Sequence, residues 1–124
     1  MSELPDGVYL RTRYEDPVTG HVRERLYDAG GEVWLVVDGE RSSWAHLDPD
    51  QVEEARRAVE GIVDVADVPA PEDAHDVARM TYQWRLGDRT GRVVDAAYPS
   101  VVPPEIDALE ETLASLEEAA AEPS

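Results

Sequence analysis

The segment Arg79-Met80-Thr81-Tyr82-Gln83-Trp84-Arg85-Leu86 decides how this chain folds. Its large apolar residues stand at alternate positions, and polar residues fill the positions between them. This period of two is typical of a β-strand that buries one side and exposes the other. The Gly- and Asp-containing residues 87–91 then predict a reversal into a second strand over residues 92–98. We expect flanking helices to cover the apolar side of this hairpin.

Four more strands are predicted upstream of the hairpin. Residues 8–14 and 21–27 alternate in polarity around a turn that contains Pro17 and Gly20. Residues 33–37 are apolar throughout, which predicts a central strand covered on both faces. Asp38-Gly39 favours a two-residue turn into residues 40–45, a pairing that would place Val33 opposite Trp44.

Two amphipathic helices complete the pattern. Leu47-Asp48-Pro49-Asp50 is a typical helix start, because Asp48 can cap the first turn and Pro49 needs no hydrogen-bond acceptor there. Both helical segments have an apolar stripe at helical spacing, formed by Val52, Ala55, Val59 and Ile62 in the first and Ile106, Leu109, Leu113 and Leu116 in the second. The sequence predicts an α+β fold with a mainly antiparallel sheet in the order β-β-β-β-α-β-β-α, and with both helices packed on the sheet.

Length and composition limit the range of functions. The 124 residues fit a single domain, residues 1–124, with residues 1–6 and 118–124 expected to be loose. A formal net charge of −17 disfavours nucleic acid as a partner, and no apolar run is long enough for a membrane span. A GC-rich genome or a salt-adapted host would also produce such an acidic chain without lysine. The missing secretion signal favours the cytoplasm.

The first 27 residues contain a candidate anion-binding patch in an otherwise acidic chain. Arg11, Arg13, Arg23 and Arg25 lie at alternate positions of the first two predicted strands. If the two strands pair in register, the four guanidinium groups share one face. The alternatives are a solvated face neutralised by nearby Glu and Asp, or a site for an anion or an acidic partner.

Catalytic and metal sites are weakly indicated. The three histidines are isolated, and no cysteine is present, so we expect neither a metal site nor a cofactor. Ser42-Ser43 with His46 and Asp48 contains the residue types of a catalytic triad, but without the glycine-flanked turn that exposes a nucleophile. We therefore expect a protein that is not an enzyme, although catalytic groups can also converge from distant segments.

A binding module is the remaining class, and one loop is a candidate for recognition. Residues 65–76 are rich in Pro and acid, which predicts an exposed, extended connection. Its candidate partner-binding residues are Glu72, Asp73, His75 and Asp76. We expect a protein partner, and the oligomeric state is left open. The alternative is an acidic interaction protein of another kind, such as a nucleic-acid mimic, an immunity protein or an accessory protein, that binds a basic partner.

From Leu47 onward the chain resembles the emfourin-like protealysin inhibitors, a bacterial family that acts on thermolysin-type metalloproteases. The resemblance covers the helix start at residues 47–50, the acidic Pro-containing loop, residues 80–86, and Val102-Pro103-Pro104-Glu105-Ile106 before the last helix. It implies a cytoplasmic protease inhibitor whose loops enter the active-site cleft. The sequence departs from the family at Met80, where an aromatic residue is usual, and in its N-terminal half. No inhibitory position can be assigned by motif.

Overall fold

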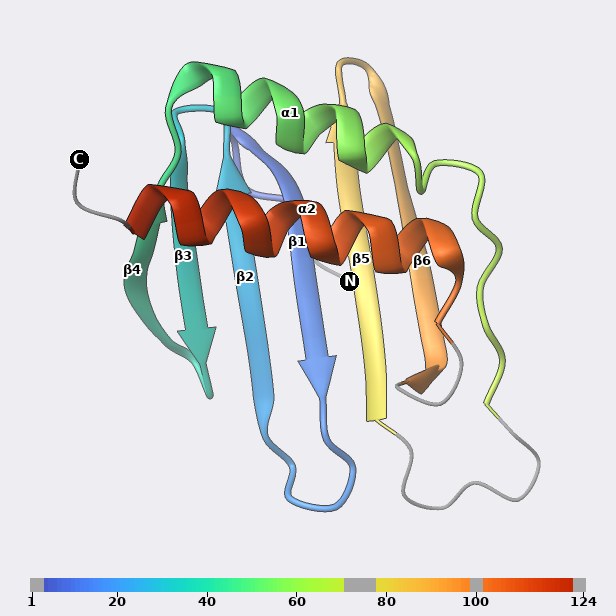
Figure 1. Cartoon of the computed structure of the whole chain (residues 1–124). Helices are drawn as coiled ribbons and strands as arrows, with labels where there is room; N and C mark the ends of the chain where they lie inside the picture. The colour runs from blue at the N-terminus through green and yellow to red at the C-terminus, as the bar shows by residue number, and fades with distance from the viewer. Residues whose placement is uncertain (1–3, 71–77, 99–101, 122–124) are drawn as a thin grey trace.

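The computed structural model describes residues 4–70, 78–98 and 102–121 (Figure 1). Its elements follow one another as β1 (Val8–Glu15), β2 (Val22–Asp28), β3 (Glu32–Val37), β4 (Glu40–His46), α1 (Pro49–Glu60), β5 (Ala78–Leu86), β6 (Arg89–Tyr98) and α2 (Pro104–Ala121). The predicted element order and the α+β class are confirmed.

All six strands form one antiparallel sheet in the spatial order β4-β3-β2-β1-β5-β6. Figure 1 shows α1 and α2 lying side by side across the same face of the sheet, α1 near one end of the strands and α2 nearer the middle. The opposite face has no helix over it among the described residues, so one face is dry and the other meets solvent.

The β5–β6 hairpin has the predicted two-sided pattern. Met80, Tyr82 and Trp84 are buried beneath the helices, with exposed fractions of 7%, 0% and 5%. Trp84 pairs directly with Gly91, where an added Cβ would lie 2.3 Å from the Trp84 ring. Gly91 is therefore required by the close approach of the indole. The turn itself is shorter than expected, because β6 already begins at Arg89.

The main core lies between the two helices and the sheet. Both predicted helical stripes are buried, together with apolar residues from β1, β2, β3, β5 and β6. Leu10, Tyr27 and Tyr82 are fully buried at its centre. A second, smaller cluster lies on the other face of the sheet, where Leu4, Val8 and Leu26 pack with the partly buried Trp34 and Val36.

Strand β3 differs from its predicted position. It lies next to the edge strand β4 and is not central, and only Val33 on it is fully buried. A register shift between β3 and β4 places Val33 opposite Ala45, so the predicted pairing with Trp44 is wrong. The two-residue turn at Asp38-Gly39 is confirmed by the pairing of Val37 with Glu40 and by positive φ at both turn residues.

Some described residues within the ranges expected to be loose have defined contacts or helical structure. Leu4 has an exposed fraction of only 6%, and the Arg85 guanidinium donates a hydrogen bond of 2.9 Å to its carbonyl oxygen. Helix α2 continues to Ala121, beyond the expected end near Glu117. The predicted exposed loop also begins later, because Val68 exchanges backbone hydrogen bonds with Val94 and Ala96 on β6.

Candidate functional site

The uncovered face of the sheet is a candidate functional surface among the described residues. Directly paired residues of neighbouring strands point to the same side of a sheet, so the pairing register traces rows across it. One row on the uncovered face crosses all six strands and consists of Ser43, Trp34, Leu26, Arg11, Gln83 and Arg92. The next consists of Arg41, Val36, Glu24, Arg13, Thr81 and Val94.

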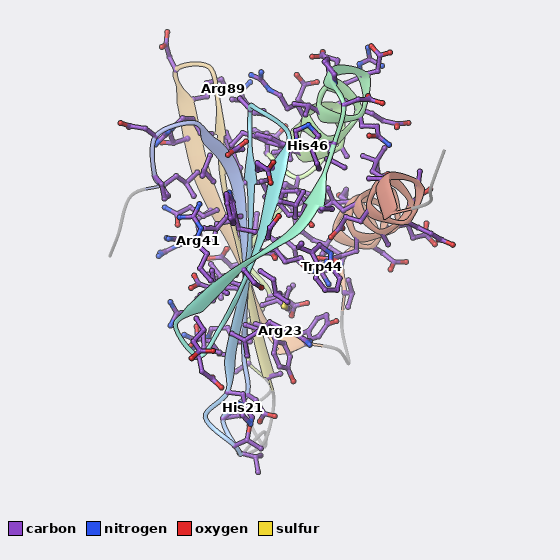
Figure 2. All side chains as sticks on the ribbon, turned by 90° about the vertical axis from the view of Figure 1, so that its left-hand side faces the viewer. His21, Arg23, Arg41, Trp44, His46 and Arg89 are labelled. Atoms are coloured by element: carbon purple, nitrogen blue, oxygen red, sulfur yellow. The ribbon has the colours of Figure 1, made fainter. Side chains whose placement is uncertain are left out.

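Arginine is concentrated on this uncovered face. The rows and their neighbours contain six of the eleven basic residues of the chain, which are Arg11, Arg13, Arg41, Arg79, Arg85 and Arg92. The acidic residues in the same rows and their neighbours are Glu15, Glu24, Asp28 and Glu32. Figure 2 shows Arg41 on this side of the sheet, away from the helices. A protein with a net charge of −17 therefore has a basic face.

Two of these arginines are neutralised locally. Arg11 lies 3.8 Å from the Glu24 carboxylate and donates to the Gln83 side chain. Arg13 lies 3.3 Å from Glu15 and 3.8 Å from Glu24. Glu15 and Glu24 thus make ion pairs with Arg11 and Arg13.

The other four arginines are distributed over the whole width of the sheet. Arg41 stacks over the Trp34 ring at 4.0 Å, a cation–π contact that holds it on β4. Arg85 binds the Leu4 and Pro5 carbonyl oxygens. Arg79 and Arg92 are exposed on β5 and β6. With Arg11 and Arg13 they line a shallow depression of about 370 Å³, whose other walls are Glu15, Thr81, Gln83 and Val94.

The predicted set of four arginines is not brought together. Arg11 pairs with Leu26 and Arg13 with Glu24, whereas Arg25 pairs with Thr12 and Arg23 with Tyr14. Arg11 and Arg13 therefore lie on the uncovered face, and Arg23 and Arg25 lie on the helix face. The prediction that all four share one face is wrong, because an even number of residues separates Glu15 from its partner Val22.

On the helix face, Arg23 and Arg25 have aromatic and acidic neighbours. Arg23 lies 5.6 Å from the centre of the Tyr14 ring, and Arg25 lies 3.9 Å from the Glu117 carboxylate on α2. Tyr27 donates a hydrogen bond of 3.2 Å to the same carboxylate. Burial raises the pKa of Glu117, and the charge of Arg25 opposes that rise. These contacts attach α2 to the sheet.

The loop residues Glu72, Asp73, His75 and Asp76 lie outside the described residues. Their role in partner recognition stays a prediction, and so does inhibition of a thermolysin-type metalloprotease through this loop.

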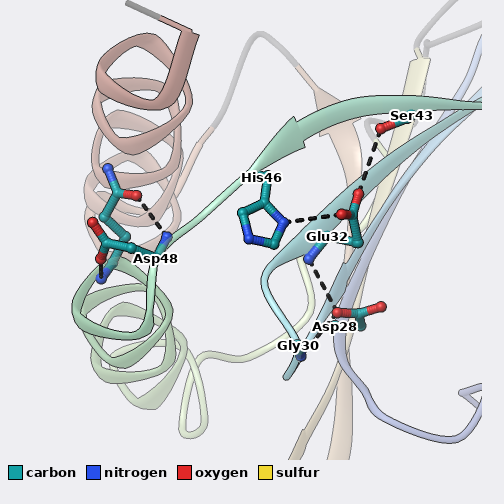
Figure 3. Close-up of polar contacts among 7 residues, drawn as sticks. Asp28, Gly30, Glu32, Ser43, His46 and Asp48 are labelled. Carbon is teal, nitrogen blue, oxygen red and sulfur yellow. Dashed lines mark hydrogen bonds and ion pairs between the residues drawn. The ribbon is translucent and has the colours of Figure 1, made fainter. Parts of the chain in front are cut away.

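The residue types of a triad near α1 are engaged in other contacts (Figure 3). His46 Nδ1 lies 2.9 Å from a Glu32 oxygen, and the Ser43 hydroxyl donates to the other oxygen of Glu32 at 3.4 Å. Asp48 instead accepts the Gln51 backbone N–H at 2.8 Å as the cap of α1. Ser43, His46 and Asp48 therefore form no serine–histidine–aspartate relay.

Neither a metal-binding cluster nor a membrane-spanning helix is found in the described ranges. No group of three or more His, Cys, Asp or Glu side chains in them is arranged to hold a metal ion. None of the helices in the same ranges has the length and apolar character needed to cross a bilayer.

Sequence reasoning missed four members of the basic face: Arg41, Arg79, Arg85 and Arg92. The polar side of residues 79–86 did contain a signal, since Arg79 and Arg85 alternate there with the buried residues. Nothing in the sequence shows that β5 pairs with β1, which is what places Arg79 and Arg92 beside Arg11 and Arg13. The proximity of these four arginines therefore depends on the order of the strands in the sheet.

No protein-family model matches the chain, and a search of curated proteins gives no match.

Proposed function

We propose that this chain is a non-enzymatic protein-binding module and that its uncovered sheet face binds an acidic segment of a partner protein. The observation that favours this function is the segregation of charge. The uncovered face has six arginines and four acidic residues, which are Glu15, Glu24, Asp28 and Glu32. Helices α1 and α2 on the other side contain ten carboxylates and two arginines.

Arginine suits the recognition of carboxylates. Its planar guanidinium group can donate two parallel hydrogen bonds to one carboxylate, and it stays charged at every physiological pH. The depression lined by Arg11, Arg13, Arg79 and Arg92 also contains Thr81 and Gln83, which add neutral polar groups for hydrogen bonding. Carboxylates at intervals along an extended peptide could contact arginines from β1, β5 and β6 together.

A short acidic protein segment fits this face better than a nucleic acid. The basic face is confined to one side of the sheet, and the surplus of carboxylates over the helices repels a long polyanion. A peptide can meet the arginines without passing the helical layer. Charge on such a surface is expected to contribute chiefly to the association rate and to selection among partners.

The test uses a labelled blocked deca-glutamate peptide, with the deca-glutamine peptide as the neutral control. Fluorescence anisotropy with the full chain should show binding of the glutamate peptide alone, and the affinity should fall as salt is raised. Arg79→Glu should weaken this binding by about five-fold or more, since it reverses an exposed charge beside the depression. Arg57→Glu, exposed on α1, changes the net charge equally and should leave the affinity within about two-fold.

Three outcomes would overturn the proposal. Binding that is equally weakened by Arg57→Glu would show a response to net charge alone. Equal binding of the glutamine peptide would remove the role of the arginines. Tighter binding of a single-stranded oligonucleotide of similar charge would assign the face to nucleic acid.

A further inference from the structure

We propose that the acidic partner segment also has an apolar side chain near its carboxylates, and that a second depression on the uncovered face binds this side chain. This inference rests on the proposed function, because it specifies the partner segment further. The second depression has a volume of about 380 Å³, and its lining includes Leu4, Gln83, Arg85, Thr90, Gly91 and Arg92. We call it the apolar depression, and the one lined by Arg11, Arg13, Arg79 and Arg92 the arginine depression.

The two depressions adjoin each other on the same side of the sheet. Gln83 and Arg92 pair directly across β5 and β6, and both residues line both depressions. Arg85 pairs with Thr90, two positions further along the strands, so these side chains point to the same side as Gln83 and Arg92. A ligand that lies along β5 would therefore meet the arginine depression first and the apolar depression next.

The two depressions differ in the kind of surface they offer. The lining surface of the apolar depression is mainly apolar, whereas that of the arginine depression is mainly polar. Leu4 also packs in the small cluster with Val8 and Leu26, so the apolar depression lies where the apolar part of the uncovered face meets its arginines. An apolar side chain gains free energy when it leaves water for such a surface, and a carboxylate loses hydration there.

One wall of the apolar depression is fixed before a partner binds. The Arg85 guanidinium donates to the Leu4 carbonyl oxygen at 2.9 Å and to the Pro5 carbonyl oxygen at 3.4 Å, which ties the start of the chain to β5. A wall that is already ordered loses little conformational freedom on binding. Carbonyl oxygens have no net charge, so Arg85 remains a positive group at the rim of the depression.

The register sets the spacing that a partner segment needs. Thr81 lines only the arginine depression and Arg85 only the apolar one, and they lie four positions apart on β5. Residues on one side of an extended segment repeat every second position, at intervals of about 7 Å. The apolar side chain is therefore expected two to four positions from a carboxylate that contacts the arginines.

The experiment compares two versions of the blocked deca-glutamate peptide, in which one central glutamate is replaced by leucine or by glutamine. The two peptides have the same charge, so fluorescence anisotropy with the full chain isolates the effect of the apolar side chain. The leucine peptide should bind about five-fold or more tightly than the glutamine peptide, since part of the leucine side chain leaves water.

Thr90→Gln tests whether the apolar depression is responsible for this preference. Thr90 is exposed on β6, and a longer, neutral, polar side chain at this position fills the depression without changing the charge. The ratio of the two affinities should fall to within about two-fold of one, while the glutamine peptide keeps its affinity. Ser115→Gln, exposed on α2 on the other side of the sheet, is the matched control and should keep the preference for leucine.

Two results would overturn this inference and leave the proposed function intact. One is equal binding of the leucine and glutamine peptides, with both weakened by Arg79→Glu. The other is a preference for leucine that survives Thr90→Gln, which would place the apolar contact elsewhere. Failure of the proposed function has a different signature, because the deca-glutamate peptide itself would then not bind.

Discussion

At the scale of single residues, Glu117 joins the helical layer to the sheet through one carboxylate. Tyr27 from β2 donates to Oε2, and Arg25 from the same strand approaches that oxygen. Tyr82 from β5 makes a similar contact with Glu110, with its hydroxyl 2.9 Å from the carboxylate. Burial raises the pKa of both tyrosines well above the ordinary value, so these hydroxyls remain donors over the whole physiological range.

Replacing Glu117 by Gln should remove a pH-dependent part of the stability. Because burial raises the pKa of Glu117 in the folded chain, its protonated form favours folding. That contribution is complete below the ordinary pKa of 4.5 and is lost as the pH rises through the higher folded value. Denaturant unfolding between about pH 4 and 8 measures the free energy of unfolding of both chains. The value for Glu117→Gln should rise relative to that of the unsubstituted chain as the pH rises.

Glu111→Gln, which is exposed on the same helix, controls for the loss of one charge in that comparison. A stability difference between the Glu117→Gln and unsubstituted chains that is constant over the whole pH range, or that falls with pH, would contradict the prediction.

At the scale of elements, α1 has a complete set of N-terminal signals. The Asp48 side chain accepts the Gln51 backbone N–H, and the Gln51 side chain accepts the Asp48 backbone N–H, both at 2.8 Å. Pro49 occupies the first turn, where its missing N–H has no intrahelical partner to lose. Figure 3 shows this cap beside the end of β4. The start of α1 thus follows from local chemistry.

Asp48→Ala should lower the free energy of unfolding by about 1 kcal/mol, the usual cost of losing such a cap. Chemical denaturation monitored by far-UV circular dichroism measures this difference. Asp50→Ala is the matched control, since Asp50 is also acidic and exposed in the first turn but is not the capping residue. Asp50→Ala should lower the free energy of unfolding by less than Asp48→Ala does. An equal decrease in both variants would show that the helix dipole, and not the cap, is responsible.

At the scale of the whole molecule, charge is separated between two layers. The helical layer is acidic, and the uncovered sheet face is basic. The net charge of −17 implies repulsion within the folded chain, and the separation concentrates that repulsion over the helices.

Raising sodium chloride from about 20 mM to about 300 mM should stabilise the protein, because screening weakens repulsion between exposed carboxylates. The midpoint of thermal unfolding should rise over this range. Glu105→Gln combined with Glu111→Gln removes two exposed charges of α2 and should reduce the increase. A midpoint that falls with salt would mean that favourable ion pairs, such as those of Arg13, outweigh the repulsion.

The sequence by itself determined the elements of this protein, their order, and the apolar side of β5 and of both helices. Alternation in β5, the Asp38-Gly39 turn and the Asp48 cap are local signals, and each acts within a few residues. The sequence also placed Arg11 and Arg13 correctly on a strand. Only the tertiary structure decided which side chains share a face, because that depends on register and strand order. A shift of one residue moves a strand's side chains to the other face, as the separation of Arg11 from Arg25 shows.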